Sequence, residues 1–127
     1  IPENEYTLPI GKAEIVKSGD QVTIVSFGKI IKEALKASEK LESEGISTEI
    51  IDLRTIRPMD HKTILESVKK TNRLVILEEA WPFGNVSTEI CYQVQNQIFD
   101  YLDAPIQKIN TADTKYALNH LLITFQY

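Results

Sequence analysis

The sequence predicts an α/β fold, a three-layer α/β/α sandwich with a mostly parallel sheet and one antiparallel edge strand. Short apolar runs rich in β-branched residues alternate along the chain with segments whose apolar residues recur at helical spacing. Strands separated by helices are joined by crossovers and therefore pair in parallel. A parallel sheet in turn needs helices on both of its faces, which gives the three layers.

Two strands are expected around a turn at residues 18–21. Residues 13–16 predict a short antiparallel edge strand, and residues 22–27 an apolar strand that is buried on both faces. Residues 28–45 predict an amphipathic helix, with Gly45 just past its end, where a positive φ costs glycine little. The apolar residues at helical spacing in this segment are Ile30, Ile31, Ala34, Leu35, Ala37 and Leu41.

A second strand and helix pair follows. Residues 47–53 alternate in the manner of a β-strand. Asp60 is placed to cap the next helix, because an aspartate side chain accepts hydrogen bonds from the first free N–H groups of a helix. We expect that helix to carry Ile64, Leu65 and Val68 on one face.

The last third of the chain repeats the alternation. Residues 73–79 predict a third buried strand, and residues 86–102 predict a helix whose apolar residues lie four positions apart. Residues 104–110 supply one more short strand, and residues 111–127 carry only a weak helical signal. The stripe expected to face the sheet from this helix consists of Val86, Ile90, Val94 and Ile98.

Composition excludes several classes of protein. The 127 residues fit one domain, and 14 scattered basic residues against 18 acidic ones leave no basic patch for nucleic acid or an anionic membrane. No apolar stretch approaches the roughly 20 residues that span a bilayer. The one cysteine, Cys91, cannot form an internal disulfide, and His61 and His120 are too far apart in sequence for a zinc motif. Cys91 is expected to be a small core residue.

The stretch EEAWPFGN, residues 78–85, directly follows an apolar strand, where α/β proteins usually bind ligands. Glu78 and Glu79 could therefore be a catalytic pair. Residues adjacent on a strand point to opposite faces, however, so the two carboxylates are badly placed to work as acid and base on one substrate. The sequence favours a structural role, in which one carboxylate accepts N–H bonds from the following loop or helix.

Three other loop residues are candidates for contacts with a partner. Trp81 cannot be fully buried by a small domain alone, and both packing and a subunit interface remain open for it. Arg54 and Arg57 flank a loop between a strand and a helix, where their guanidinium groups could clamp a carboxylate across a subunit boundary. A solvated role, in which exposed ion pairs contribute little, remains open for both arginines.

Several segments in order resemble the carboxyl-terminal domain of pyruvate dehydrogenase beta subunits, within the transketolase-like thiamine diphosphate enzymes. They are LPIGKAEI, IDLRTIRPMD, SVKKTNRLVILEEAWP, TEIC and YLDAPIQKI. The resemblance implies an α/β sandwich at residues 13–113, preceded by a linker at 1–12 from an amino-terminal domain and followed by a tail at 114–127. The family's cofactors, thiamine diphosphate and magnesium, would be bound outside this chain.

The resemblance also implies partners. These are the alpha subunit and a second beta subunit in an α2β2 tetramer, and dihydrolipoyl acetyltransferase, the core of the multienzyme complex. Asp103, within YLDAP, matches the acidic residue that meets basic groups of the acetyltransferase. We therefore expect this domain to serve assembly and docking, with no nucleic acid or membrane partner. The expected location is the mitochondrial matrix, the bacterial cytoplasm or another organelle of bacterial origin.

The chain departs from the family pattern at two places. Asn85 and Ser87 stand where the family tends to have glycines, and the end ALNHLLITFQY replaces a proline-rich segment and a final helix that also touches the acetyltransferase. Two alternatives stay open beside the main hypothesis. One keeps the family with a branched-chain 2-oxo acid dehydrogenase or a transketolase activity, and the other is a free-standing α/β module that binds a small ligand.

Overall fold

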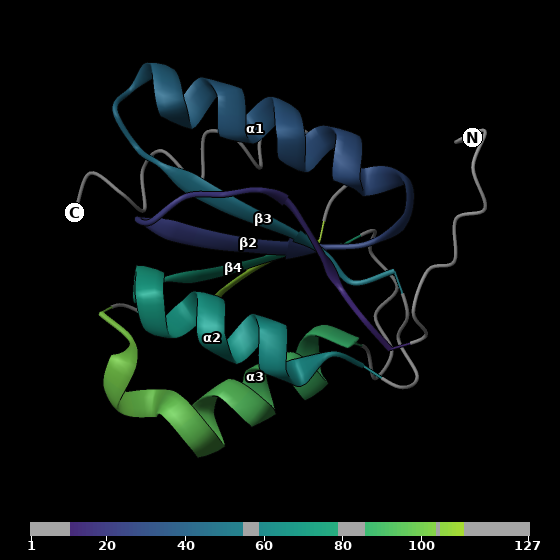
Figure 1. The fold of residues 1–127 in the computed structure, drawn as a ribbon, viewed down its shortest axis with the longest axis vertical. Helices are drawn as coiled ribbons and strands as arrows, with labels where there is room; N and C mark the ends of the chain where they lie inside the picture. Colours follow the sequence, from purple (N-terminus) through teal and green to yellow (C-terminus); the bar gives the residue numbers. More distant parts are fainter. Residues whose placement is uncertain (1–10, 55–58, 79–85, 104, 111–127) are drawn as a thin grey trace.

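The structure, a computed structural model, describes residues 11–54, 59–78, 86–103 and 105–110 (Figure 1). Within these ranges the chain forms a five-stranded sheet in the order β1-β3-β2-β4-β5. The edge strand β1 runs antiparallel to β3, and the other neighbours are parallel. The strands are β1 (Glu14–Lys17), β2 (Val22–Ser26), β3 (Thr48–Asp52), β4 (Leu74–Glu78) and β5 (Gln107–Asn110).

Helices cover both faces of the sheet. Figure 1 shows α1 on one face and α2 together with α3 on the other. The α-helices in the part of the chain that the structure describes are α1 (Ile31–Ser43), α2 (His61–Thr71) and α3 (Val86–Ile98). The predicted three-layer sandwich with a mostly parallel sheet and one antiparallel edge strand is therefore confirmed.

The central strands bury both of their faces, as their apolar sequences predict. Successive residues alternate between two core clusters, because side chains on a strand point to opposite faces. The strand residues in the cluster under α1 are Val22, Ile24, Ile50, Val75 and Leu77. Those in the cluster under α2 and α3, some of them just past a strand end, are Val25, Ile51, Leu53, Leu74 and Ile76.

The helix after β2 differs from the prediction in its first turn and on its buried face. Residues Gly28–Ile30 form a short 3-10 helix, η1, before α1 begins. Ile31 and Leu35 are only half-buried, whereas Ser38 is fully buried. A polar side chain is accommodated there because the Ser38 hydroxyl is hydrogen-bonded to Thr48 and accepts a hydrogen bond from Lys17 Nζ at 2.6 Å.

The predicted helix signals at Gly45 and Asp60 are confirmed. Gly45 follows the end of α1 with a φ of 85°. Asp60 caps α2, because its Oδ1 accepts the N–H of Thr63 at 3.1 Å. In α2, Ile64 and Val68 are buried and Leu65 is half-buried.

The helix predicted over residues 86–102 is shorter in the structure. Helix α3 ends at Ile98, and Phe99–Tyr101 form a second 3-10 helix, η2. The backbone of Ile98 leaves the helical region, with a φ of −136°. In the predicted stripe, Ile90, Val94 and Ile98 are buried, and the side chain of Val86 lies outside the described residues.

Candidate interaction surface

Arg54 lies just past the carboxyl end of β3 and has a φ of 57°, an uncommon backbone conformation for a residue other than glycine. Its N–H donates to Asp52 Oδ1 at 3.0 Å, and its guanidinium group forms an ion pair with Glu14 of the edge strand. Arg54 thus binds a carboxylate of its own chain. Arg57, the other predicted arginine, lies outside the described residues.

Glu78 is the last residue of β4 and is 3% exposed. Its neighbour Glu79 lies outside the described residues, and so does Trp81. The structure therefore places one member of the carboxylate pair, and it places that member in the interior. Burial at a strand end agrees with the structural role that the sequence favours for one of the two glutamates.

Asp103 lies at the opposite end of the parallel strands from Arg54 and Glu78. It follows η2 and comes before β5, on the side where the parallel strands begin, whereas Arg54 and Glu78 lie where strands end. Arg54 and Asp103, the two predicted partner-binding residues that the structure describes, consequently do not form a single site. Asp103 is the one that the structure places beside a surface hollow.

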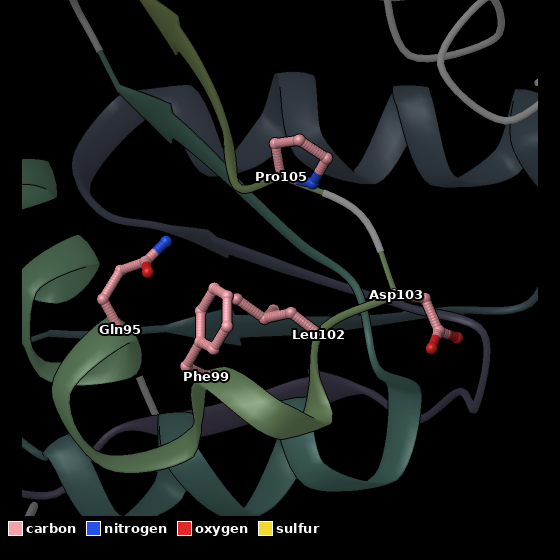
Figure 2. Close-up of a pocket in the computed structure, with 5 residues that line it drawn as sticks. All are labelled: Gln95, Phe99, Leu102, Asp103 and Pro105. Carbon is pink, nitrogen blue, oxygen red and sulfur yellow. The ribbon is translucent and has the colours of Figure 1, made fainter.

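This hollow has a volume of about 400 Å³. Figure 2 shows the Leu102 side chain extending toward the Phe99 ring, and the Asp103 carboxylate pointing away from both. Asp103 is exposed, and no described side chain forms an ion pair or hydrogen bond with its carboxylate. The residues that line the hollow are Gln95, Phe99, Leu102, Asp103 and Pro105.

The surface around the hollow is aromatic and poor in basic residues. Tyr92 and Phe99 are each 61% exposed, and Tyr101 is 46% exposed. Aromatic side chains are enriched at protein interfaces. Residues 74–107 contain no lysine, arginine or histidine. Lys69 on α2 supplies a cation at the side of this surface, where its Nζ lies 5.6 Å from the centroid of the Tyr101 ring. This combination suits a partner that presents basic groups beside apolar ones.

A family profile described as the transketolase C-terminal domain matches residues 11–126. The chain belongs to the transketolase carboxyl-terminal domain family. It is 54% identical over 118 residues to the pyruvate dehydrogenase E1 component subunit beta of Rhizobium meliloti. It is 52% identical over 119 residues to the mitochondrial subunit beta-1 of Arabidopsis thaliana. These alignments cover 91% and 92% of this chain but only 26% and 33% of the two relatives, so the chain spans a third of their length or less.

Solved structures share the fold of this chain. A split-gene transketolase, described as an inactive beta4 tetramer, matches with a TM-score of 0.74 and 27% identity. The match covers 86% of this chain and 35% of that one. A 2-oxoglutarate:ferredoxin oxidoreductase from Magnetococcus marinus shares the fold, with a TM-score of 0.60 at 13% identity over 88% of this chain and 19% of its own.

This chain also contains a buried charged group that the sequence did not predict. Glu49 on β3 is 2% exposed. Its carboxylate accepts hydrogen bonds from Lys70 Nζ and Ser67 Oγ, each at 2.5 Å, and from the N–H of Gly19 at 3.4 Å. Burial alone would raise the pKa of Glu49, but the hydrogen bonds and the charge of Lys70 outweigh it, and the pKa is lowered.

The Glu49 cluster is structural rather than a ligand site, because the chain's own groups occupy the carboxylate. It continues to Thr23 Oγ1, which lies 2.7 Å from both Ser67 Oγ and Thr71 Oγ1. In residues 11–54, 59–78, 86–103 and 105–110, no group of His, Cys, Asp or Glu side chains is arranged to hold a metal ion. Nor is any helix in those ranges long and apolar enough to cross a membrane.

Residues that sequence reasoning missed at the hollow are Gln95, Phe99, Leu102 and Pro105. The prediction of one continuous helix at 86–102 does not include the break after Ile98, which lies directly before Phe99 at the hollow. A signal was nevertheless available, since the 34-residue stretch at 74–107 lacks basic residues and contains the aromatic residues Tyr92, Phe99 and Tyr101, which the structure exposes. Cys91, expected in the core, is partly buried against the cluster under α2 and α3.

Proposed function

We propose that this chain is the carboxyl-terminal domain of the beta subunit of a thiamine-dependent pyruvate dehydrogenase component. The single observation that carries the proposal is the similarity to pyruvate dehydrogenase beta subunits at 54% and 52% identity. The whole enzyme would oxidatively decarboxylate pyruvate and transfer the acetyl group to lipoyl groups. The domain, which we place at residues 13–113, would serve subunit assembly and docking.

Docking would use the Asp103 surface. A basic side chain of dihydrolipoyl acetyltransferase would pair with the Asp103 carboxylate, which has no partner among the described side chains. The apolar part of the same partner segment would cover Phe99 and Leu102 at the hollow. An acidic group beside exposed aromatic residues supports such a contact, because aromatic anchors supply affinity and opposite charges supply orientation.

Assembly would use other residues than docking does. We propose that Arg54, Arg57 and Trp81 contribute to contacts with the alpha subunit and the second beta subunit in an α2β2 tetramer. The uncommon backbone conformation of Arg54 supports a constrained role there. The similar split-gene transketolase is itself described as a tetramer, which supports oligomeric assembly.

Thiamine diphosphate and magnesium would be bound by other parts of the assembly. Thiamine diphosphate would supply the decarboxylation chemistry there, and we assign no step of it to this chain. The related proteins include mitochondrial and bacterial forms, which supports the mitochondrial matrix, the bacterial cytoplasm or another organelle of bacterial origin as the location.

The test is an Asp103→Ala substitution in the assembled tetramer, with titration of the acetyltransferase's subunit-binding domain by calorimetry. Losing a charge pair at an interface should weaken binding by about tenfold to a hundredfold. Asp103→Lys should weaken it further, because it opposes like charges.

Asp100 offers a matched control, since it is an exposed aspartate three residues away on η2. Asp100→Ala removes the same charge and should leave the affinity within about twofold of the unmodified protein, as for most rim charges. Equal affinities for the Asp103→Ala and unmodified tetramers would exclude the proposed docking contact.

A further inference from the structure

Asn72 joins two connections that are far apart in the sequence. It occupies the short link between α2 and β4 and adopts a left-handed conformation with a φ of 65°. Its N–H donates to Val68 O at 2.7 Å and so closes the last turn of α2. Asparagine is one of the few residues besides glycine that adopt this conformation readily.

Two hydrogen bonds run between Asn72 and the segment that carries Asp103. The N–H of Asp103 donates to Asn72 O at 2.8 Å, and Asn72 Nδ2 donates to Tyr101 O at 2.7 Å. Lys69, one turn earlier on α2, lies over the Tyr101 ring. The backbone on both sides of Leu102 is thereby tied to the end of α2, and Leu102 itself packs against the core.

We propose that Asn72 is a positioning residue for the Asp103 docking site. This inference rests on the proposed function. With the N–H of Asp103 and the carbonyl of Tyr101 both held, the Asp103 carboxylate keeps only its side-chain torsions, so little conformational entropy remains to be lost when a basic group binds. Asn72 itself makes no contact with the partner and acts through the position of Asp103.

The variant that isolates this role is Asn72→Gly. Glycine accepts the left-handed backbone and keeps the carbonyl that Asp103 uses, but it removes the Nδ2 donor to Tyr101. We expect it to weaken acetyltransferase binding by the assembled tetramer about fivefold to tenfold, through loss of preorganisation. Amide hydrogen exchange of Asp103 in the free tetramer should become faster by a similar factor.

A double-mutant cycle with Asp103→Ala separates positioning from general stability. If Asn72 acts through Asp103, then Asn72→Gly should have no further effect on affinity once Asp103 is alanine. Gly45→Ala is the matched control, because it disturbs another left-handed residue at a helix end, on the far side of the sheet. It should leave the affinity unchanged in both backgrounds.

Each outcome decides the inference. A loss of affinity in Asn72→Gly that is additive with Asp103→Ala, or no loss at all, overturns the positioning role while the docking role of Asp103 stands. No effect of Asp103→Ala overturns the proposed docking function and this inference with it. Should Asn72→Gly fail to fold, Asn72→Asp tests the same point, because it tolerates the left-handed backbone but replaces the donor with an acceptor.

Discussion

Gly19, in the turn between β1 and β2, lies directly against the backbone of β3. A Cβ atom added there would overlap the carbonyl carbon and oxygen of Thr48 and would lie 2.8 Å from the backbone nitrogen of Glu49. Backbone atoms of a central strand cannot move aside as a flexible side chain can. We therefore expect Gly19→Ala to lower the free energy of unfolding by about 3 kcal/mol, measured by urea denaturation of the full chain.

The control for this prediction is Gly45→Ala. Gly45 has a positive φ but open space where a Cβ would stand, so alanine adds backbone strain without overlap. Its cost should be about 1 kcal/mol. Equal losses of stability in the two variants would contradict the steric account of Gly19.

Residues with local roles could be predicted from the sequence, and residues with distant partners could not. The cap at Asp60 and the positive φ at Gly45 follow from their places beside an apolar periodic run. Glu49 gave no such signal, because its partners come from the turn at Gly19 and from Ser67 and Lys70 on α2. Which residues surround a buried carboxylate depends on the tertiary fold, which a local pattern does not specify.

At the scale of elements, α2 is fixed at its amino end by a single carboxylate. Asp60 Oδ1 accepts the N–H of Thr63, and Asp60 Oδ2 accepts both the Thr63 hydroxyl at 2.5 Å and the N–H of Ala13 at 2.9 Å. The same side chain thus caps the helix and holds the start of the edge strand β1. Hydrogen bonds to a charged acceptor are stronger than neutral ones.

Replacing Asp60 should therefore cost more than the loss of an ordinary helix cap. We expect Asp60→Ala to lower the free energy of unfolding by about 2–3 kcal/mol, since a cap alone contributes about 1 kcal/mol and the Ala13 N–H also loses its acceptor. Urea denaturation measures this. Asp60→Asn keeps an acceptor oxygen without the charge and should cost less. If Asp60→Asn lowers the free energy of unfolding as much as Asp60→Ala does, the stabilisation comes from the charge of the carboxylate and not from the position of its acceptor oxygen.

The sequence predicted the kinds and order of the elements better than their neighbours in the sheet. Apolar periodicity marks each helix and strand because burial acts on every residue of an element. The prediction placed an antiparallel strand at one edge but did not give the order β1-β3-β2-β4-β5. The prediction also did not show that Asp103 and Arg54 lie far apart. Their separation arises because Asp103 precedes a strand whereas Arg54 follows one.

At the scale of the whole molecule, two carboxylates connect the edge strand to α2 at opposite ends of the helix. Glu49 joins the turn after β1 to Ser67 and Lys70, and Asp60 joins the start of β1 to the start of α2. Burial would raise the pKa of Asp60, but hydrogen bonds from Thr63 and Ala13 and the charge of Lys12 outweigh it. The pKa of Asp60 is therefore lowered, like that of Glu49.

A lowered pKa in the folded state makes stability depend on pH in a defined direction. Above the ordinary pKa of a carboxyl group, both residues are ionised whether or not the chain is folded, and their full contribution is present. As the pH falls from about 5 to about 3, the unfolded chain takes up protons before the folded one, and stability is lost. The loss should appear as a falling urea midpoint across that range.

The variant Glu49→Gln should make this profile flatter. It removes one of the two groups that cause the loss, at a cost near neutral pH of about 2 kcal/mol, because the neutral amide binds Lys70 and Ser67 less strongly than the carboxylate does. Glu39→Gln on the exposed face of α1 is the control and should reproduce the unmodified profile. Parallel urea midpoints for Glu49→Gln and the unmodified chain from neutral to acid pH would mean that the acid sensitivity arises from other carboxylates. If the urea midpoint of Glu49→Gln alone falls less steeply with pH, the acid sensitivity arises from the buried link between β3, α2 and the turn at Gly19.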